Sequence, residues 1–215
     1  MLLDHVGAFV PSDTLRIDEV LFCLGEKNIT IQYLMRAIGR SAFPIFAFLI
    51  TEGFVHTSNK KRYALNLLTF ALISEIPFNL ACSDDFFCAK QNVYFTLLFG
   101  FLGICLLEAY KQTRDKRYLC FIISLFLFTI VFRADYGCFG YGFIILLYVL
   151  RENRIIMAII GSCVLPSRWI GGVSFIPICM YNGKRGFASG KIAKYGFYLF
   201  YPAHLLLLYL IRCFV

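Results

Sequence analysis

The sequence has little charge and no long polar segment. Asp, Glu, Lys and Arg together make up 16% of its 215 residues, whereas hydrophobic residues make up 60% and aromatic residues 18%. Soluble domains contain about 45–50% apolar residues, so a separate water-soluble domain is excluded. We expect residues 1–215 to form a single integral membrane domain surrounded by membrane lipid.

Metal-ligand spacing is also missing. The nine cysteines include no Cys-x-x-Cys pair, and most lie in apolar runs, where a free cysteine behaves as a small hydrophobic residue. We therefore expect no metal cofactor. Cys82 and Cys88 flank a short loop and could form a disulfide in an oxidising compartment or remain free thiols.

The first residues lack the features of a cleavable signal peptide. Residues 1–5 contain no basic region, and no small-residue cleavage site follows them. The net charge of +8 would suit nucleic acid, but the basic residues fall between apolar runs, as membrane topology requires. We therefore expect no nucleic-acid partner.

Long apolar runs are the main feature that the sequence does contain. A membrane-spanning helix needs about 20 mostly apolar residues. The first run is too short to cross alone, which leaves open whether residues upstream of Met1 complete it. The seventh and eighth runs flank Pro166 and form either two tilted spans or one re-entrant pair. The sequence predicts an all-α, polytopic membrane helix bundle with eight or nine transmembrane helices. The runs are residues 1–10, 31–56, 63–82, 92–110, 118–133, 136–150, 154–165, 168–181 and 195–211.

The loops between these runs alternate in charge. The loops after the second, fourth, sixth and eighth runs hold thirteen Lys and Arg residues, whereas the opposite set holds six. Cytoplasmic loops of membrane proteins collect Lys and Arg. We therefore expect a cytoplasmic N-terminus and an external C-terminus.

Residues 36–56 have the composition of a membrane-spanning helix, yet they contain ionisable side chains. Such a group costs about 2.5–3.5 kcal/mol at the centre of a helix in lipid, so it normally faces a protein interior or a wet cavity. Arg36 and Arg40 lie four residues apart, as do Glu52 and His56, so each pair occupies one face of the helix. This pattern favours a helix that lines a site over a simple anchor.

Further polar residues fall toward the expected outer side of the membrane. They are Glu75, Asn92 and Asp135, which lie near the ends of apolar runs. Unpaired charges are unfavourable at this depth, which suggests that the two carboxylates neutralise Arg36 and Arg40. The cluster could be a structural ion-pair network that holds the bundle together, or it could face a substrate.

A basic turn faces Glu52 and His56 at the expected inner side. Its sequence is Tyr181-Asn182-Gly183-Lys184-Arg185-Gly186. Glycines on either side of two cations allow backbone N–H groups and both side chains to converge on a phosphate. The alternative is that the turn is one more positively charged cytoplasmic loop.

The three histidines are candidate general bases, because imidazole titrates near neutral pH. His5 follows Asp4, a carboxylate that could raise its basicity. Adjacent helical residues point about 100° apart, however, so Asp4 could serve another group. His204 follows Pro202 in the last run, and a lone helical histidine is more often a packing residue than a catalyst. His56 is the third candidate.

Nine short segments combine these polar residues with their neighbours: Leu3–Gly7, Arg40–Phe48, Glu52–Thr57, Ile73–Phe78, Gln91–Val93, Phe95–Leu97, Asp135–Gly137, Asn182–Gly186 and Phe197–His204. Taken in order, they cover almost the whole chain and resemble the TraX family, named for the membrane protein that acetylates F-type pilin. The family in turn is similar to multi-spanning acyltransferases that move acetyl groups from cytoplasmic acetyl-CoA to acceptors across the membrane. The resemblance implies a bacterial cytoplasmic membrane protein with its base on an early helix, here His5, and with Lys184 and Arg185 on the CoA phosphates.

The leading hypothesis is therefore a membrane-embedded acetyltransferase that uses acetyl-CoA. His5, assisted by Asp4, would deprotonate an acceptor amine or hydroxyl on a peptide, lipid or glycan. CoA would bind near four residues of the inner side, which are His56, Asn182, Lys184 and Arg185. The tetrahedral oxyanion needs hydrogen-bond donors, and the candidates are Arg36, Arg40, Asn92 and Tyr201.

Two other functional classes fit the same residues. Buried carboxylates and histidines such as His204 are typical of proton-coupled transporters, here of small solutes. A non-catalytic membrane assembly factor would use the charged residues only to lock helices together and to contact a partner. The sequence does not specify the oligomeric state.

Overall fold

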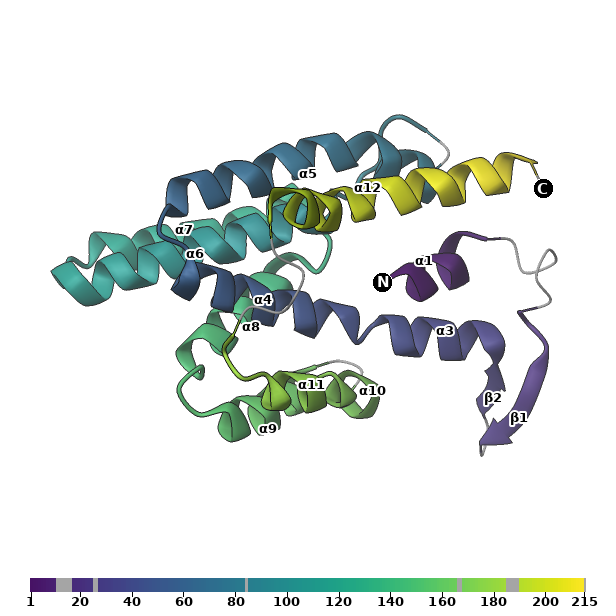
Figure 1. Cartoon of the computed structure of the whole chain (residues 1–215), viewed down its shortest axis with the longest axis horizontal. Coiled ribbons are helices and arrows are strands. Elements are labelled where there is room, and N and C mark those ends of the chain that lie inside the picture. The colour runs from purple at the N-terminus through teal and green to yellow at the C-terminus, as the bar shows by residue number, and fades with distance from the viewer. Residues whose placement is uncertain (11–16, 25–26, 84, 166–167, 185–189, 215) are drawn as a thin grey trace.

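The structure is a computed structural model that describes residues 1–10, 17–24, 27–83, 85–165, 168–184 and 190–214. It is a helical bundle (Figure 1), which confirms the predicted fold class. The elements are α1 (Leu2–Phe9), β1 (Val20–Leu24), β2 (Lys27–Thr30), α3 (Ile31–Gly39), α4 (Ala42–His56), α5 (Lys60–Ser83), α6 (Val93–Thr113), α7 (Arg117–Phe132), α8 (Gly137–Val149), α9 (Arg154–Val164), α10 (Arg168–Val173), α11 (Phe175–Met180) and α12 (Lys191–Phe214).

Helix α6 is the centre of the bundle. It packs against α4, α5, α7 and α8, and residues 94–101 are buried in succession. A helix that is apolar and buried on all sides is a core helix. At Gly100 the missing side chain lets Ile144 of α8 approach closely, as small residues do between membrane helices.

Helix length limits how many elements can cross a bilayer. Among the residues that the structure describes, four stretches are long and apolar enough to do so: residues 31–56, 60–83, 93–113 and 191–214. Helices α7 and α8 are shorter, with 16 and 13 residues. The predicted count of eight or nine spans is therefore not confirmed, and the cytoplasmic N-terminus stays a prediction.

The seventh and eighth apolar runs form short helices that turn back on one another. Helix α9 has 11 residues, or about 17 Å at 1.5 Å per residue, against a hydrocarbon core of about 30 Å. It packs against both α10 and α11, which have six residues each. This arrangement fits the re-entrant pair better than two tilted spans.

A two-stranded hairpin was not predicted from the sequence. Strands β1 and β2 pair antiparallel, with Val20 opposite Thr30 and Phe22 opposite Ile29. The sequence prediction considered only runs long enough for a membrane helix, so this short stretch of β-prone residues was treated as a loop. Thr30 then caps α3, because its hydroxyl accepts a hydrogen bond from the Tyr33 amide at 3.1 Å.

The predicted helix over residues 31–56 is divided into α3 and α4, which follow each other almost end to end (Figure 1). Helix α1 packs against both α3 and α12, so the first residues of the chain lie beside the last helix.

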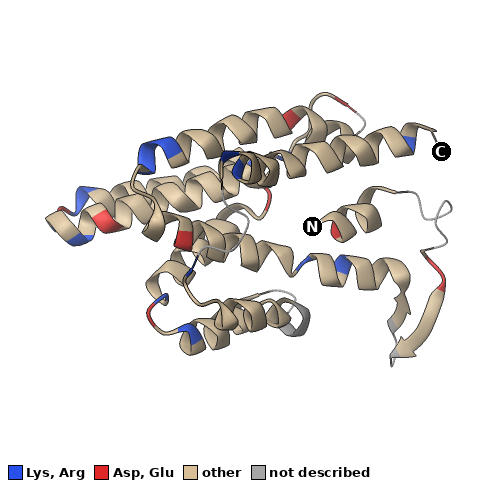
Figure 2. Ribbon diagram, in the orientation of Figure 1, with Lys and Arg blue, Asp and Glu red and all other residues tan. Residues whose placement is uncertain are grey.

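Figure 2 shows Lys and Arg gathered at the bundle end where α5 and α7 begin. Two of the loops that the charge pattern assigned to the cytoplasm, the one before α5 and the one before α7, therefore lie together at this end of the bundle.

Candidate functional site

Two histidines from opposite ends of the chain are in direct contact. His5 on α1 and His204 on α12 approach to 2.7 Å between Nδ1 of the first ring and Nε2 of the second. The rings are stacked, with an angle of 10° between their planes. Both were candidates from the sequence, and the structure places them in one hydrogen-bonded pair.

The hydrogen bonds of this pair assign the proton positions when both rings are neutral. Nδ1 of His204 lies 2.6 Å from the Phe200 carbonyl oxygen, which can only accept, so this nitrogen carries a proton. Nε2 of His204 is then an acceptor, and Nδ1 of His5 donates to it. The remaining nitrogen of His5, Nε2, is left with a free lone pair, as a general base requires.

Pro202 explains why α12 forms a hydrogen bond with α6 close to this histidine pair. Proline has no N–H, so the Tyr198 carbonyl, four residues earlier, loses its helical partner. The Tyr94 hydroxyl of α6 donates to that carbonyl at 2.9 Å. The Tyr94 ring also meets the Tyr201 ring edge-on, with centroids 5.3 Å apart. The proline thus creates the acceptor that ties α6 to α12.

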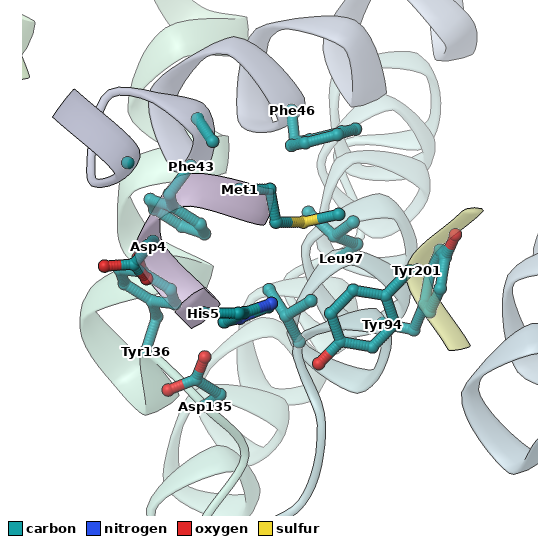
Figure 3. Close-up of a pocket in the computed structure, with 13 residues that line it drawn as sticks. Met1, Asp4, His5, Phe43, Phe46, Tyr94, Leu97, Asp135, Tyr136 and Tyr201 are labelled. Atoms are coloured by element: carbon teal, nitrogen blue, oxygen red, sulfur yellow. The ribbon is translucent and has the colours of Figure 1, made fainter. Parts of the chain in front are cut away.

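A small cavity of about 60 Å³ adjoins His5. It is large enough for a group of a few heavy atoms, since a water molecule needs about 10–15 Å³ by this measure. In Figure 3 the His5 ring points into it toward Tyr94 and Tyr201, whereas Asp4 points the other way. We call it the histidine pocket; its walls include Met1, Asp4, His5, Gly39, Ala42, Phe43, Phe46, Val93, Tyr94, Leu97, Asp135, Tyr136 and Tyr201.

Asp135 supplies a carboxylate to the histidine pocket from the turn between α7 and α8. Burial raises the pKa of this carboxyl above its usual range, and the backbone of Tyr136 opposes that shift. The turn is held in place by Gln91, whose carbonyl accepts from the Asp135 amide at 2.8 Å. The sequence analysis expected this carboxylate to neutralise Arg36 or Arg40, but the structure places it in the wall of the histidine pocket with His5.

The predicted partners of Arg36 were wrong. Its guanidinium forms an ion pair with Asp4 at 2.9 Å and also donates to the Asp4 carbonyl at 3.2 Å. The Asp4 carboxylate therefore neutralises Arg36 rather than assisting His5. The sequence could not show this, because only the packing of α1 on α3 brings the two residues together. Arg40 is exposed at the end of α3.

Glu75 was also expected to neutralise an arginine, but its partner is Asn92. The Asn92 amide donates to Glu75 at 2.5 Å and to the Ala71 carbonyl at 2.8 Å, and its oxygen caps α6 by accepting from the Tyr94 amide. Asn92 is fully buried and is not among the walls of the histidine pocket. It is a structural residue that joins α5 to α6, not a donor to a bound oxyanion.

The close packing of α1 on α3 gives a testable prediction. A Cβ at Gly39 would lie 2.6 Å from the Asp4 backbone, so Gly39→Ala should push α1 away and lower stability by about 1–3 kcal/mol. The control is Gly142→Ala, because a Cβ there meets no atom within 4 Å. Thermal unfolding in detergent measures both, and equal melting temperatures would contradict the packing described.

A larger cavity of about 610 Å³ lies toward the end of α4. We call it the basic-end cavity. Glu52 and His56, 3.3 Å apart, line it together with Tyr181 and Gly183, so the predicted approach of the glycine-containing turn is confirmed. The other residues of its walls are Leu49, Gly53, Thr57, Tyr63, Lys194, Phe197 and Tyr198.

Among the described residues, the cation that lines this cavity is Lys194, whereas the sequence analysis expected Lys184 and Arg185. The backbone amide of Lys184 donates to the Asn182 side chain at 2.9 Å, which shapes the turn. Arg185 lies outside the described residues. Lys194 lines the cavity but was missed as a site residue, because the sequence analysis counted it only toward membrane topology. Its position one helical turn before Tyr198 was the available signal.

The two cavities are separated by about one helical turn. On α4 Phe46 borders the histidine pocket and Leu49 borders the basic-end cavity, and on α12 Tyr201 and Tyr198 do the same. Three residues of helix span about 4.5 Å. The Tyr94–Tyr198 hydrogen bond lies at this boundary. The polar residues therefore line two neighbouring spaces, which share helices α4 and α12.

Comparisons with known proteins agree with the resemblance seen in the sequence. No solved structure matches the chain. The probable fimbrial assembly protein FimC, serogroup H1, of Dichelobacter nodosus is 30% identical over 203 residues, with 81% of each chain covered. The family model described as TraX protein matches residues 1–212. The chain therefore belongs to the TraX family.

Proposed function

We propose that this chain is a membrane-embedded acetyltransferase that transfers the acetyl group of acetyl-CoA to an acceptor amine or hydroxyl. The observation that carries the proposal is the His5–His204 pair, which leaves a base nitrogen of His5 beside a pocket of acetyl-group size. A pilin-like peptide is the favoured acceptor class, since the family is associated with pilin acetylation and the relative is named for fimbrial assembly. A cell-surface lipid or glycan is the alternative.

The basic-end cavity would hold the CoA portion of the donor. Its volume of about 610 Å³ lies within the range of about 300–1,000 Å³ typical of ligand sites. Lys194, with Lys184 on the adjacent turn, would provide positive charge for phosphates. Glu52 would repel phosphate, but His56 lies close enough to neutralise it when protonated. The thioester would reach the histidine pocket between α4 and α12.

The reaction in the histidine pocket would be a direct transfer. Nε2 of His5 accepts a proton from the acceptor as its nitrogen or oxygen attacks the thioester carbonyl carbon. The carbon–sulfur bond then breaks, and the leaving thiolate takes that proton from His5. Of the donors considered for the oxyanion, Tyr201 lines the pocket, whereas Arg36 and Asn92 are engaged elsewhere.

Donor binding and turnover test this proposal separately. We expect CoA to raise the melting temperature of the purified protein, and labelled acetyl-CoA to transfer its acetyl group to a peptide bearing a free amine. Lys194→Ala should weaken CoA binding about 10- to 150-fold, since a hydrogen bond to a charged group contributes about 1.5–3 kcal/mol. Lys191→Ala is the control, because that side chain is exposed and absent from the cavity wall.

The proposal fails if millimolar CoA leaves the melting temperature unchanged and labelled acetyl groups stay on the donor. That result would favour a non-catalytic role in assembly, which the name of the relative also suits. In that case the partly buried polar pairs Asp4–Arg36 and Glu75–Asn92 would only hold the helices together. Pilin acetylation in cells carrying His5→Ala separates the two roles, because only a catalytic role makes acetylation depend on His5.

A further inference from the structure

Cys82 and Cys88 place two thiols in contact at the bundle end away from the basic loops. Cys82 lies in the last turn of α5 and Cys88 lies before α6, and their sulfur atoms are 3.8 Å apart. Cys82 is exposed and Cys88 is half-buried. The sequence analysis left this pair open between a disulfide and free thiols, and the structure has free thiols at short range.

Several contacts hold this end of α5 in place. The Asn79 side chain donates to the Phe86 carbonyl at 2.7 Å and so draws the loop back onto the helix. The Arg212 guanidinium of α12 donates to the Leu80 and Ala81 carbonyls at 3.0 and 3.2 Å. The short distance between the two sulfur atoms is therefore supported by several hydrogen bonds rather than by one.

The same segment leads directly to the histidine pocket. Gln91 follows Cys88 by three residues, and its amide donates to the Arg133 carbonyl at 3.1 Å while its carbonyl accepts from the Asp135 amide. Asp135 is a wall of the histidine pocket. A covalent link between the two cysteines would therefore restrain the segment that contains Gln91, and through the hydrogen bonds of Gln91 it would also restrain the turn that contains Asp135.

Charge indicates which side of the membrane this loop faces. The sequence of the loop contains one cation, Lys90, and two acidic residues, Asp84 and Asp85, whereas the thirteen cations of the alternate loops mark the cytoplasmic side. Disulfides form and persist outside the cytoplasm, where the environment is oxidising. The thiol pair thus faces the compartment in which it would be oxidised.

We infer that Cys82 and Cys88 are a redox modification site that closes to a reversible disulfide on the external side of the membrane. The sulfur atoms must approach from 3.8 Å to about 2.05 Å, a movement of less than about 2 Å. The inference does not rest on acetyl transfer, because it concerns only the two thiols and their loop.

The chemistry is a thiol–disulfide exchange with an external disulfide oxidant, either a thiol–disulfide oxidoreductase or oxidised glutathione. One cysteine thiolate attacks the oxidant and forms a mixed disulfide, and half of the oxidant leaves as a thiolate. The second cysteine thiolate then attacks the first cysteine sulfur and releases the other half. The oxidant gains two electrons, and the two cysteine protons end on its thiolates or in water.

Chymotryptic cleavage provides a direct test on the full-length protein in membranes. Phe86 and Phe87 lie between the cysteines and are 63% and 85% exposed, so cleavage after either separates Cys82 from Cys88 unless a disulfide joins them. After equilibration with oxidised glutathione, we expect the two peptides to remain joined and two of the nine cysteines to escape alkylation. Reduced glutathione should separate the peptides and restore full alkylation.

Matched variants complete the test. Cys82→Ser and Cys88→Ser should each abolish the joined peptide, whereas Cys120→Ser, an exposed cysteine at the start of α7, should leave it unchanged. An unchanged melting temperature in the serine variants shows that the loop is still folded. Complete alkylation of both cysteines after oxidation, or linkage of either to a different cysteine, would overturn the inference.

Discussion

Replacing His5 by alanine is expected to lower the rate of acetyl transfer by about 10²–10⁴-fold, the usual contribution of a general base. The reason is that the variant loses the ring nitrogen that the contact with His204 orients toward the histidine pocket. The fold should persist, since His5 contributes chiefly ring contacts with Phe9, Tyr201 and His204. The measurement is turnover of labelled acetyl-CoA, with thermal unfolding on the same sample.

Variants of His204 distinguish its positioning role from simple packing. His204→Gln retains an oxygen that can accept from Nδ1 of His5, whereas His204→Leu retains only bulk. We expect the glutamine variant to keep more activity than the leucine variant at similar melting temperatures. Phe9→Leu is a control for packing, because Phe9 stacks on His5 without a hydrogen bond. Undiminished turnover in His5→Ala would remove His5 from the mechanism.

The largest expected effect on stability comes from Asn92→Ala. The substitution removes the cap of α6, worth about 1 kcal/mol, and leaves the Glu75 carboxylate without the Asn92 donor; the Ala71 carbonyl loses only a second donor, because it lies within α5. A buried acceptor without a partner costs about 1–3 kcal/mol. We therefore expect a loss of about 2–4 kcal/mol in the free energy of unfolding, measured in detergent or bicelles.

Two further variants assign this loss to the Asn92–Glu75 contact. Glu75→Gln keeps an acceptor at the same reach, so it should cost clearly less than Asn92→Ala. Glu75→Leu introduced into Asn92→Ala should recover part of the loss, because it removes the unpaired carboxylate. The explanation fails if the double variant is less stable than Asn92→Ala by the full cost of Glu75→Leu alone.

The sequence was informative wherever a property depends on residues close together in the chain. Apolar runs predicted the helices, and ionisable residues within those runs predicted which helices line cavities, as Glu52 and His56 show. Span number was less predictable, because α8 and α9 are apolar without being long enough to cross a bilayer unaided. The β1–β2 hairpin was missed because its strands are shorter than any membrane helix.

Partner choice between distant helices could not be derived from local patterns. The i, i+4 spacing of Arg36 and Arg40 shows that they share a face, but not which helix that face meets. The ion pair with Asp4 follows from α1 lying on α3. The contact between His5 and His204 joins residues 199 positions apart. Only the three-dimensional packing of α1 against α12 provides that information.

The proline in α12 leaves a polar backbone atom at the boundary between the two cavities. Since Pro202 removes the internal donor, the Tyr198 carbonyl depends on either Tyr94 or water for its hydrogen bond. Without that phenol, the carbonyl would need a water molecule from one of the two cavities as its donor. The Tyr94 hydroxyl therefore keeps α12 bonded to α6 at the turn where α12 has lost a hydrogen bond of its own.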